Sequence, residues 1–211
     1  ARLADIGSDH AYLPGALMRR GVITAAVAGE VAATPFHAAN RTVGDNCLEQ
    51  RISVRLADGL AAIEAGDDIT AISLCGMGGE TIRDILDSGK AHLNGRERLI
   101  LQPNGGEQPL RRWLMENGYQ ILHEEVLREN RFYYEIIVAE CAEGVSYSAE
   151  QLYFGPVQMQ ARTPQFLAKW QRLLRQKRKA LASLEQARQG LSVQKVQEIE
   201  QQIAWINQLL A

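Results

Sequence analysis

Short apolar stretches alternate with longer amphipathic ones along the first two thirds of the chain. Each apolar stretch spans four to six residues, which is typical of a buried strand. The stretches between them carry apolar residues at helical spacing and end at glycines. Such alternation predicts a doubly wound α/β domain with a parallel sheet. The predicted strands cover residues 3–6, 25–30, 52–56, 69–74 and 98–101, and the predicted helices cover about 13–20, 35–44 and 80–86, with a fourth ending near 118.

The pattern changes after the fifth predicted strand. Two β-prone runs, residues 119–129 and 132–140, flank Asn130-Arg131 and predict a hairpin that adds one antiparallel strand. Residues 145–164 contain two turn-forming pairs that end in proline, and they predict a loop.

The last fifty residues have helical periodicity. Their apolar residues recur at three- and four-residue spacing on both sides of a break at 189–192, where Ser192 can cap a second helix. Two such seams predict an antiparallel, coiled-coil-like helical hairpin. We therefore expect two parts, an α/β domain over residues 1–161 and a helical hairpin over 162–211. The seams consist of Trp170, Leu174, Leu181 and Leu184, then Val196, Ile199, Ile203, Ile206 and Leu210.

Carboxylates, amides and glycines follow each of the five predicted parallel strands. In an open α/β sheet, ligands bind outside the carboxyl ends of the strands, and these ends share one edge. A single acid at a strand end is often only a helix cap, but five consecutive occurrences favour a binding site. The residues in question are Asp5 and Gly7, Glu30, Asp58 and Gly59, Gly76 and Gly78, and Gln102 and Asn104.

The turn after the first strand is the most informative stretch. An acid followed by a glycine turn and a helix suits a nucleotide-like ligand, because backbone N–H groups and the positive helix end lie close by. The dinucleotide fingerprint is absent, since Gly7 stands alone and Asp5 would repel a pyrophosphate. A phosphate-free adenosyl sulfonium therefore fits better than NAD. An ordinary turn in which Ser8 or Asp9 caps the helix is an equally good interpretation of this stretch.

Charge is divided unevenly along the chain. Residues 1–161 hold 14 Lys and Arg against 22 Asp and Glu, a net charge of −8, whereas residues 162–211 hold 9 against 3, a net charge of +6. An acidic body with a basic tail favours a polyanionic partner that contacts the tail. Because the first tail helix carries few acids between its cations, RNA binding is a better interpretation than a solvated helix face.

Composition restricts compartment and cofactor class. The three cysteines form no Cys-x-x-Cys pair, which indicates a reducing, cytoplasmic setting without a disulfide framework. Histidine and cysteine spacing predicts no metal site. No apolar run is long enough to cross a membrane, and the first residues lack a signal-peptide pattern. The chain enters its first strand without a lead-in helix, so we expect a missing N-terminal segment. The sequence leaves the oligomeric state open, a monomer included.

Four stretches together resemble the bacterial TrmK family of tRNA (adenine(22)-N(1))-methyltransferases. The resemblance extends over nearly the whole chain and implies a Rossmann-like class I S-adenosylmethionine-dependent methyltransferase domain followed by a coiled-coil hairpin. Members of this family carry a helix ahead of the first strand, which this sequence lacks. The four stretches are Asp5-Ile6-Gly7-Ser8-Asp9-His10-Ala11-Tyr12-Leu13-Pro14, Ala28-Gly29-Glu30, Gly76-Met77-Gly78-Gly79 and Arg98-Leu99-Ile100-Leu101-Gln102-Pro103-Asn104.

The resemblance implies S-adenosyl-L-methionine as cofactor and places Asp5 and Gly7, with the adjoining Ser8, beside its methionine part. Glu30 is expected to accept the ribose hydroxyls, as acids at this position do in dinucleotide folds. Asp58 is expected to accept the adenine amine, and Gly59 to leave room for the ring. Gly76 and Met77 would form the pocket floor, although Met77 as plain core filler is a serious rival interpretation.

Transfer to adenine N1 needs positioning more than a strong base, because N1 carries a lone pair at neutral pH. The exocyclic amine becomes acidic as the base becomes cationic, and Asp9 is the candidate carboxylate beside it. Asn104 can orient the N1 and N6 edge, His10 can relay the proton and Tyr12 can stack on the base. A structural role for His10 in the turn is the alternative.

A target base inside folded tRNA must leave its stack, at a cost of a few kcal/mol, and phosphate contacts can offset this cost. Two other functions remain open on sequence alone: a nucleotide-dependent oxidoreductase on a similar sheet, and a non-catalytic RNA-binding module with a vestigial pocket. The residues expected to contact RNA are Lys169, Arg172, Arg175, Arg178 and Lys179.

Overall fold

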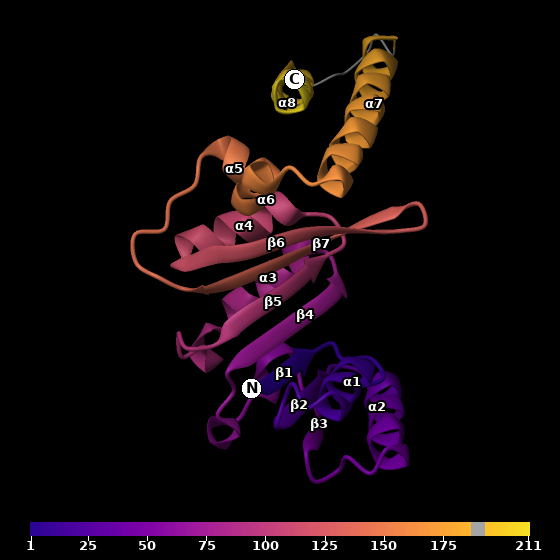
Figure 1. Ribbon diagram of the computed structural model, residues 1–211, viewed down its shortest axis with the longest axis vertical. Helices are drawn as coiled ribbons and strands as arrows, with labels where there is room; N and C mark the ends of the chain where they lie inside the picture. Colours follow the sequence, from indigo (N-terminus) through magenta and orange to yellow (C-terminus); the bar gives the residue numbers. More distant parts are fainter. Residues whose placement is uncertain (187–192) are drawn as a thin grey trace.

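The computed structural model contains a seven-stranded sheet with the order β3-β2-β1-β4-β5-β7-β6 (Figure 1). It describes residues 1–186 and 193–211. Strands β1 to β5 are parallel, and β7 is antiparallel to both β5 and β6, as the sequence predicts. The strands are β1 (Arg2–Ile6), β2 (Ala25–Glu30), β3 (Ile52–Leu56), β4 (Ala71–Met77), β5 (Arg98–Pro103), β6 (Tyr119–Glu129) and β7 (Phe132–Cys141).

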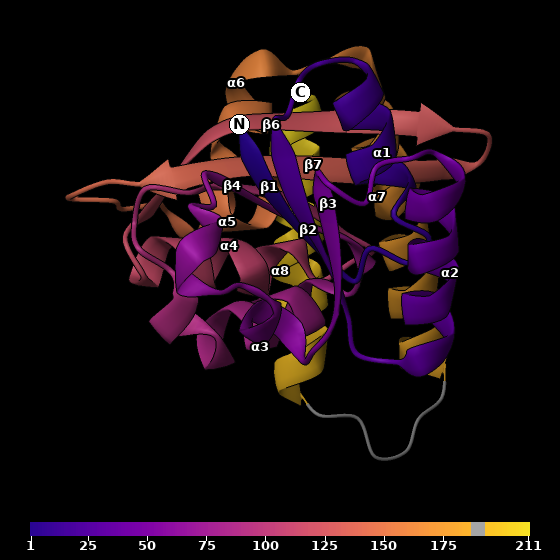
Figure 2. The same ribbon diagram turned by 90° about the horizontal axis from the view of Figure 1, so that it is seen from below.

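Alternate residues of the central strands face two separate cores. In β1, Leu3 packs with the core beneath α1 and α2, whereas Ala4 and Ile6 pack with the core beneath α3 and α4. Figure 2 shows these two helix pairs on opposite sides of the strands. The first helices are α1 (Tyr12–Arg19), α2 (Ala33–Asp45), α3 (Gly79–Ser88) and α4 (Glu107–Glu116), with short 3₁₀ turns η1 (Gly59–Ala62), η2 (Ala65–Asp67) and η3 (Lys90–His92).

Two details differ from the sequence-based expectation. Strand β4 continues past Leu74 to Met77, because a bulge opposite β5 between Cys75 and Met77 absorbs Gly76 at φ +76°. The predicted loop over 145–164 instead contains two short helices, α5 (Ala149–Phe154) and α6 (Pro156–Ala161).

The prolines of this segment begin helices rather than end them. Pro156 occupies the first turn of α6, and Pro164 is the first residue of α7, positions where a missing N–H costs nothing. Ser148 and Gln151 form a reciprocal capping box at the start of α5. The two turn-forming pairs therefore mark helix starts, and reading them as loop signals was wrong.

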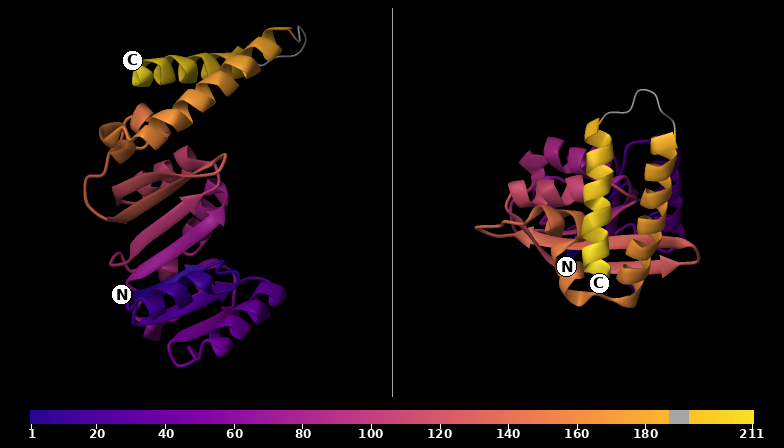
Figure 3. Two further views of the ribbon diagram at one scale, coloured as in Figure 1. Left: turned by 45° about the vertical axis from the view of Figure 1, so that its right-hand side comes forward. Right: turned by 90° about the horizontal axis from the view of Figure 1, so that it is seen from above.

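The tail consists of α7 (Pro164–Gln186) and α8 (Val193–Leu210), which lie beyond the β6 edge of the sheet (Figure 3). They run in opposite directions, as Figure 3 shows. Two hydrogen bonds join them, from Lys177 Nζ to Gln202 Oε1 at 2.6 Å and from Arg178 Nη2 to Asn207 Oδ1 at 2.9 Å. Coiled-coil packing between them stays a prediction. The expected break at 189–192, with its cap Ser192, lies outside the described residues. A third core joins the tail to the hairpin through Val126, Phe154, Phe166, Trp170, Leu174, Ile206 and Leu209.

Candidate functional site

The five parallel strands end at one edge of the sheet. The chain proceeds from β1 outward through β2 to β3, and then from β4 outward through β5, so β1 and β4 are neighbours at the point where the strand order reverses. Ligands of open α/β sheets bind at such a point, outside the carboxyl ends. All twelve residues expected to bind cofactor or take part in catalysis lie on this edge, in β1, β2, β4, the turns that follow the strands, or the first residues of α1 and η1.

The turn after β1 has an unusual backbone. Gly7, Asp9 and Ala11 all have positive φ, at +70°, +58° and +54°. For residues with a side chain this region costs of order 1–3 kcal/mol, and such strain clusters at functional sites. The N–H groups of Gly7 and Ser8 donate to the carbonyl of Gly29, at 2.9 and 3.3 Å, which ties the turn to β2. These two N–H groups are therefore occupied within the protein.

Asp5 links β1 to β4. Its carboxylate is 4% exposed and accepts hydrogen bonds from the hydroxyls of Ser8 and Ser73, both at 2.6 Å. Burial raises the pKa of Asp5, and the two serine hydroxyls counteract it. This arrangement makes Asp5 the internal support of the turn. Ser73, which holds it from β4, was not identified from the sequence because a lone serine inside a strand gives no signal.

Glu30 ends β2 beneath the same turn. Its carboxylate is 5% exposed and accepts the backbone N–H of Asp9. Burial raises the pKa of Glu30, while the Asp9 N–H lowers it and the charges of Asp9 and Asp5 raise it further. Only Oε1 takes part in this bond, so Oε2 keeps acceptor capacity for a hydroxyl.

Two amides hold the end of β4. The Gly76 N–H donates to Gln102 Oε1 and Asn104 Nδ2 donates to the Gly76 carbonyl, both at 2.9 Å. Gln102 Nε2 also donates to Asn104 Oδ1 at 2.9 Å, so the two amides form one unit. A Cβ added to Gly76 would meet no atom within 4 Å, which leaves space above this residue. Gln102 thus joins the site as a residue that positions Asn104.

Met77 connects the ends of β4 and β1. Its Cε lies 3.1 Å from the position a Cβ would take on Gly7, and its side chain packs against the central core. Met77 therefore lies beneath the turn as part of both the core and the edge. Gly79 has a different role: a Cβ there would overlap the Gly106 carbonyl oxygen, so the turns after β4 and β5 touch backbone to backbone.

The remaining expected residues lie at the rim. Asp58 is exposed, and Gly59, at φ +52°, lies against Ile85, whose Cγ2 would be 3.1 Å from an added Cβ. Its lack of a side chain thus serves contact with α3. His10 and Tyr12 stack on each other, with ring centroids 5.0 Å apart, and Tyr12 is 65% exposed. His10 Nε2 lies 3.7 Å from Asp9 Oδ1.

The cations of α7 divide into two sets. Arg175 and Lys179 are exposed, and Arg178 is exposed while contacting Asn207. Lys169 is different: its side chain is 11% exposed and its ammonium pairs with Glu135 and Glu107, the latter at 3.3 Å. The contact of Lys169 with RNA stays a prediction, and these ion pairs count against it, because they use the charge of Lys169 to join α7 to the sheet.

Three further features of the described residues were considered: a second cavity, metal-binding clusters and membrane-spanning helices. A cavity of about 320 Å³ opens at the amino end of the strands, lined by Glu64, Asp68, His92 and Glu97 among others, away from the carboxyl edge where ligands of such sheets bind. Residues 1–186 and 193–211 contain no cluster of three or more His, Cys, Asp or Glu residues suited to a metal ion. No helix in these ranges is long and apolar enough to cross a membrane.

Residues 3–208 match the model of the family TrmK, tRNA (adenine(22)-N(1))-methyltransferase. The chain belongs to this family. It is 40% identical to the tRNA (adenine(22)-N(1))-methyltransferase of Bacillus subtilis over 193 residues, which is 89% of this chain and 80% of that protein.

Two solved structures support the assignment. The crystal structure of Bacillus subtilis TrmK superposes with a TM-score of 0.90 at 34% identity, covering 100% of this chain and 92% of the other. That of Streptococcus pneumoniae Sp1610, in complex with S-adenosyl-L-methionine, superposes with a TM-score of 0.89 at 40% identity, covering 99% and 92%. The expected Rossmann-like fold and methyltransferase class are thereby confirmed, and the oxidoreductase alternative is disfavoured.

Proposed function

We propose that the carboxyl edge of the sheet is the catalytic site of a methyltransferase that acts on N1 of an adenine in tRNA, adenine 22 as the family name specifies. The observation that carries this proposal is the convergence of Asp5, Glu30 and the Gly7 turn at the reversal of strand order, in a chain that matches the TrmK family over almost its whole length.

The residues of the edge fit S-adenosyl-L-methionine. Glu30 offers a largely buried carboxylate with a free acceptor, and Gly76 borders open space. The edge is rich in acids, which suits a cationic sulfonium and opposes a pyrophosphate. We assign the ribose hydroxyls to Glu30, the methionine part to the Gly7–Ser8 turn supported by Asp5, the adenine to Asp58 and Gly59, and the floor to Gly76 and Met77. When bound, the cofactor supplies an electrophilic methyl group.

The rim residues are positioned to handle the acceptor base. Asp9 stabilises positive charge as it develops on the exocyclic amine, and His10 beside it carries the proton to solvent. Tyr12 is exposed and already stacked on His10, so it can offer its outer face to a base. Asn104 is held by Gln102 and Gly76, which fixes its amide before the base arrives.

The tail is assigned to tRNA. Arg172, Arg175, Arg178 and Lys179 give one helix a run of cations that can contact successive phosphates. We assign residues 1–161 to catalysis and residues 162–211 to RNA binding, in a monomer located in the cytoplasm.

The direct test is methyl transfer. The protein is incubated with S-adenosyl-L-methionine and a tRNA transcript, and the product is digested and mapped by mass spectrometry. We expect a single N1-methyladenine at position 22. Modification of another base would contradict the assignment, and binding of cofactor without transfer would favour the RNA-binding module.

Asp9→Asn separates the chemical role of Asp9 from its structural one. The substitution keeps the side-chain shape and the backbone N–H that Glu30 accepts, so cofactor affinity measured by calorimetry should not change. The rate constant of transfer should fall by about 100-fold, in the range that a lost charge-stabilising group typically costs. Loss of cofactor affinity instead would assign Asp9 to the cofactor-binding part of the site.

A further inference from the structure

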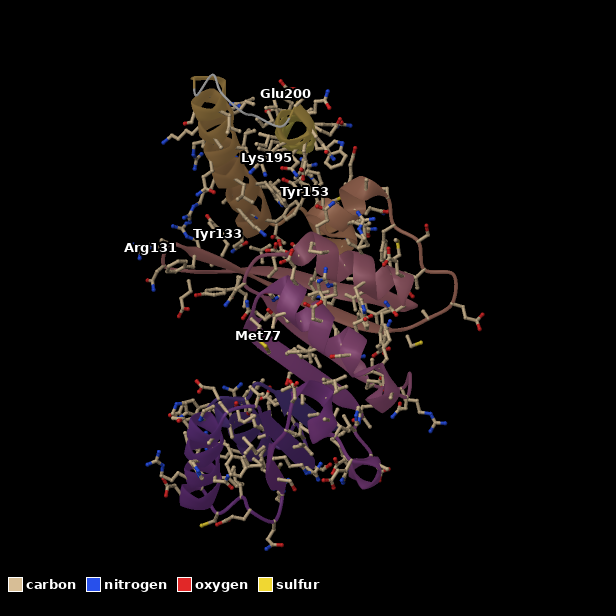
Figure 4. All side chains as sticks on the ribbon, turned by 180° about the vertical axis from the view of Figure 1, so that it is seen from behind. Met77, Arg131, Tyr133, Tyr153, Lys195 and Glu200 are labelled. Atoms are coloured by element: carbon tan, nitrogen blue, oxygen red, sulfur yellow. The ribbon has the colours of Figure 1, made fainter. Side chains whose placement is uncertain are left out.

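A groove lies where the tip of the β6–β7 hairpin meets α7. Its volume is about 220 Å³. Figure 4 shows Tyr133 between the hairpin and α7, and Arg131 at the hairpin tip. The lining residues are Phe132 and Tyr133 from β7 and Lys169, Arg172, Leu173 and Gln176 from α7.

Two arginines of the hairpin lie beside the aromatic residues of this groove, and a third, Arg172, lines it. The Arg131 guanidinium carbon lies 5.1 Å from the Phe132 ring centroid, and that of Arg128 lies 5.8 Å from the Tyr133 ring centroid. Arg172 donates a hydrogen bond to the Arg131 carbonyl, which joins helix and hairpin. Phe132 is 50% exposed, so its ring is accessible to a ligand.

The charge of the groove is positive. Of the acids nearby, Glu135 is buried and paired with Arg111 and Lys169, so its charge is neutralised within the protein. Glu129 is exposed at the tip, opposite Phe132 in the hairpin. Against this one acid stand Arg128, Arg131 and Arg172, which leaves an excess of two positive charges. Such a combination of guanidinium groups and exposed aromatic faces suits a polyanion with planar bases.

The groove is on the same side of the molecule as the catalytic edge. Leu101 of β5 pairs with Ile137 of β7, and the strands are antiparallel, so residues before Ile137 extend past the carboxyl end of β5. Phe132 lies five positions further, roughly 17 Å along the strand at about 3.4 Å per residue. In Figure 4, Met77 at the end of β4 and Arg131 at the tip lie toward the same side.

We propose that this groove binds an unpaired nucleotide of the substrate RNA, with its base stacked on Phe132 and Tyr133 and its phosphates contacted by Arg131 and Arg172. The site rests on the proposed function and adds to it a second RNA contact, on the sheet rather than on the tail alone. Its volume is below the roughly 300–1,000 Å³ of pockets that enclose whole small molecules, which fits one planar group.

We propose an unpaired nucleotide rather than one in a duplex, because the faces of bases inside an A-form duplex are covered by the neighbouring bases. A loop nucleotide can present a free face to an aromatic ring, and this stacking accepts any base. The hairpin tip then holds the RNA beside the catalytic edge, while the α7 cations contact phosphates further along.

The test compares two matched double variants. Arg131→Ala with Phe132→Ala removes one exposed arginine and one exposed ring from the groove. Arg20→Ala with Val22→Ala removes an exposed arginine and an exposed apolar side chain just after the end of α1. Binding of a tRNA transcript is measured by fluorescence anisotropy at several salt concentrations, and cofactor binding by calorimetry.

We expect the groove variant to bind tRNA about 10- to 100-fold more weakly than the control. The slope of log affinity against log salt concentration should be shallower, by the amount that corresponds to the loss of about one phosphate contact. Its KM for tRNA should rise while its kcat and cofactor affinity match the control. An unstructured RNA oligonucleotide should displace tRNA from the wild-type protein better than a duplex of equal length, and the groove variant should lose this difference.

Two outcomes would overturn the inference. If the groove variant binds and methylates tRNA as the control does, the groove takes no part in RNA binding. If sedimentation shows that it changes the oligomeric state without changing tRNA affinity, the groove is a contact between copies of the chain. Failure of the wild-type protein to methylate tRNA would instead refute the proposed function.

Discussion

Gly7→Ala is the substitution that most directly tests the proposed cofactor site. Gly7 has φ +70°, and a Cβ there would lie 3.1 Å from Met77 Cε. The new methyl group would therefore enter the space beneath the turn and displace Met77 by a few tenths of an ångström. Both changes occur where we place the methionine part of the cofactor.

The backbone penalty of this substitution can be separated from its effect on the site. Gly21 has φ +69°, and an added Cβ would meet no atom within 4 Å. A left-handed alanine costs roughly 1–2 kcal/mol at either position. For a chain of this length that corresponds to a decrease in melting temperature of about 2 to 8 °C. Because the Met77 terminus can shift, the two variants should have similar melting temperatures.

Calorimetric titration with S-adenosylhomocysteine then distinguishes the two variants. Gly21→Ala should bind like the wild-type protein. Gly7→Ala should bind at least about tenfold more weakly, since overpacking of about 1–3 kcal/mol falls where the ligand needs room. Equal affinity of the two variants, at equal stability, would refute the placement of the cofactor over Gly7.

Two further predictions concern charge. Glu30→Gln should raise the melting temperature at pH 7 and weaken S-adenosylhomocysteine binding about tenfold, because burial raises the pKa of Glu30 and its ionised form opposes folding. In the wild-type protein, the folded state holds the Glu30 proton more tightly than the unfolded state does. The gain in melting temperature should therefore shrink as the pH is lowered toward 4.5, the ordinary pKa of the group. Thermal melts at several pH values would show this. Arg175→Glu with Lys179→Glu should weaken tRNA binding and flatten its salt dependence, whereas Arg20→Glu with Arg41→Glu should leave both unchanged in anisotropy titrations.

The five parallel strands were predictable because each is a short, mainly apolar run bounded by turn residues, and the last two strands because two β-prone runs flank Asn130-Arg131. The convergence of strand ends followed from topology alone, since parallel strands of one sheet end at one edge. The sequence could not show which polar side chains form hydrogen bonds with one another. Ser73 donates to Asp5 from a position 68 residues away, and Gln102 accepts the N–H of Gly76 from a position 26 residues away.

The role of Lys169 could not be predicted either, because it depends on a buried group of charges from separate elements. Arg111 of α4 pairs with Glu124 of β6 at 2.7 Å and with Glu135 of β7. Although burial opposes it, Arg111 and Lys169 hold the pKa of Glu135 below its ordinary value, whereas burial raises the pKa of Glu124. A run of cations on a helix does not reveal which member points inward.

This buried group also bears on where we propose that the RNA lies. It joins α7 to the hairpin and α4, so the cations of the tail are held on one side of the sheet. The catalytic edge itself carries Asp5, Asp9, Glu30 and Asp58, and these acids would repel a phosphate backbone laid across them. A neutral base swung out of its stack meets no such repulsion. Separation of the acidic edge from the cationic arm thus favours entry of a single extruded base, with the phosphates held to the side by α7 and the hairpin tip.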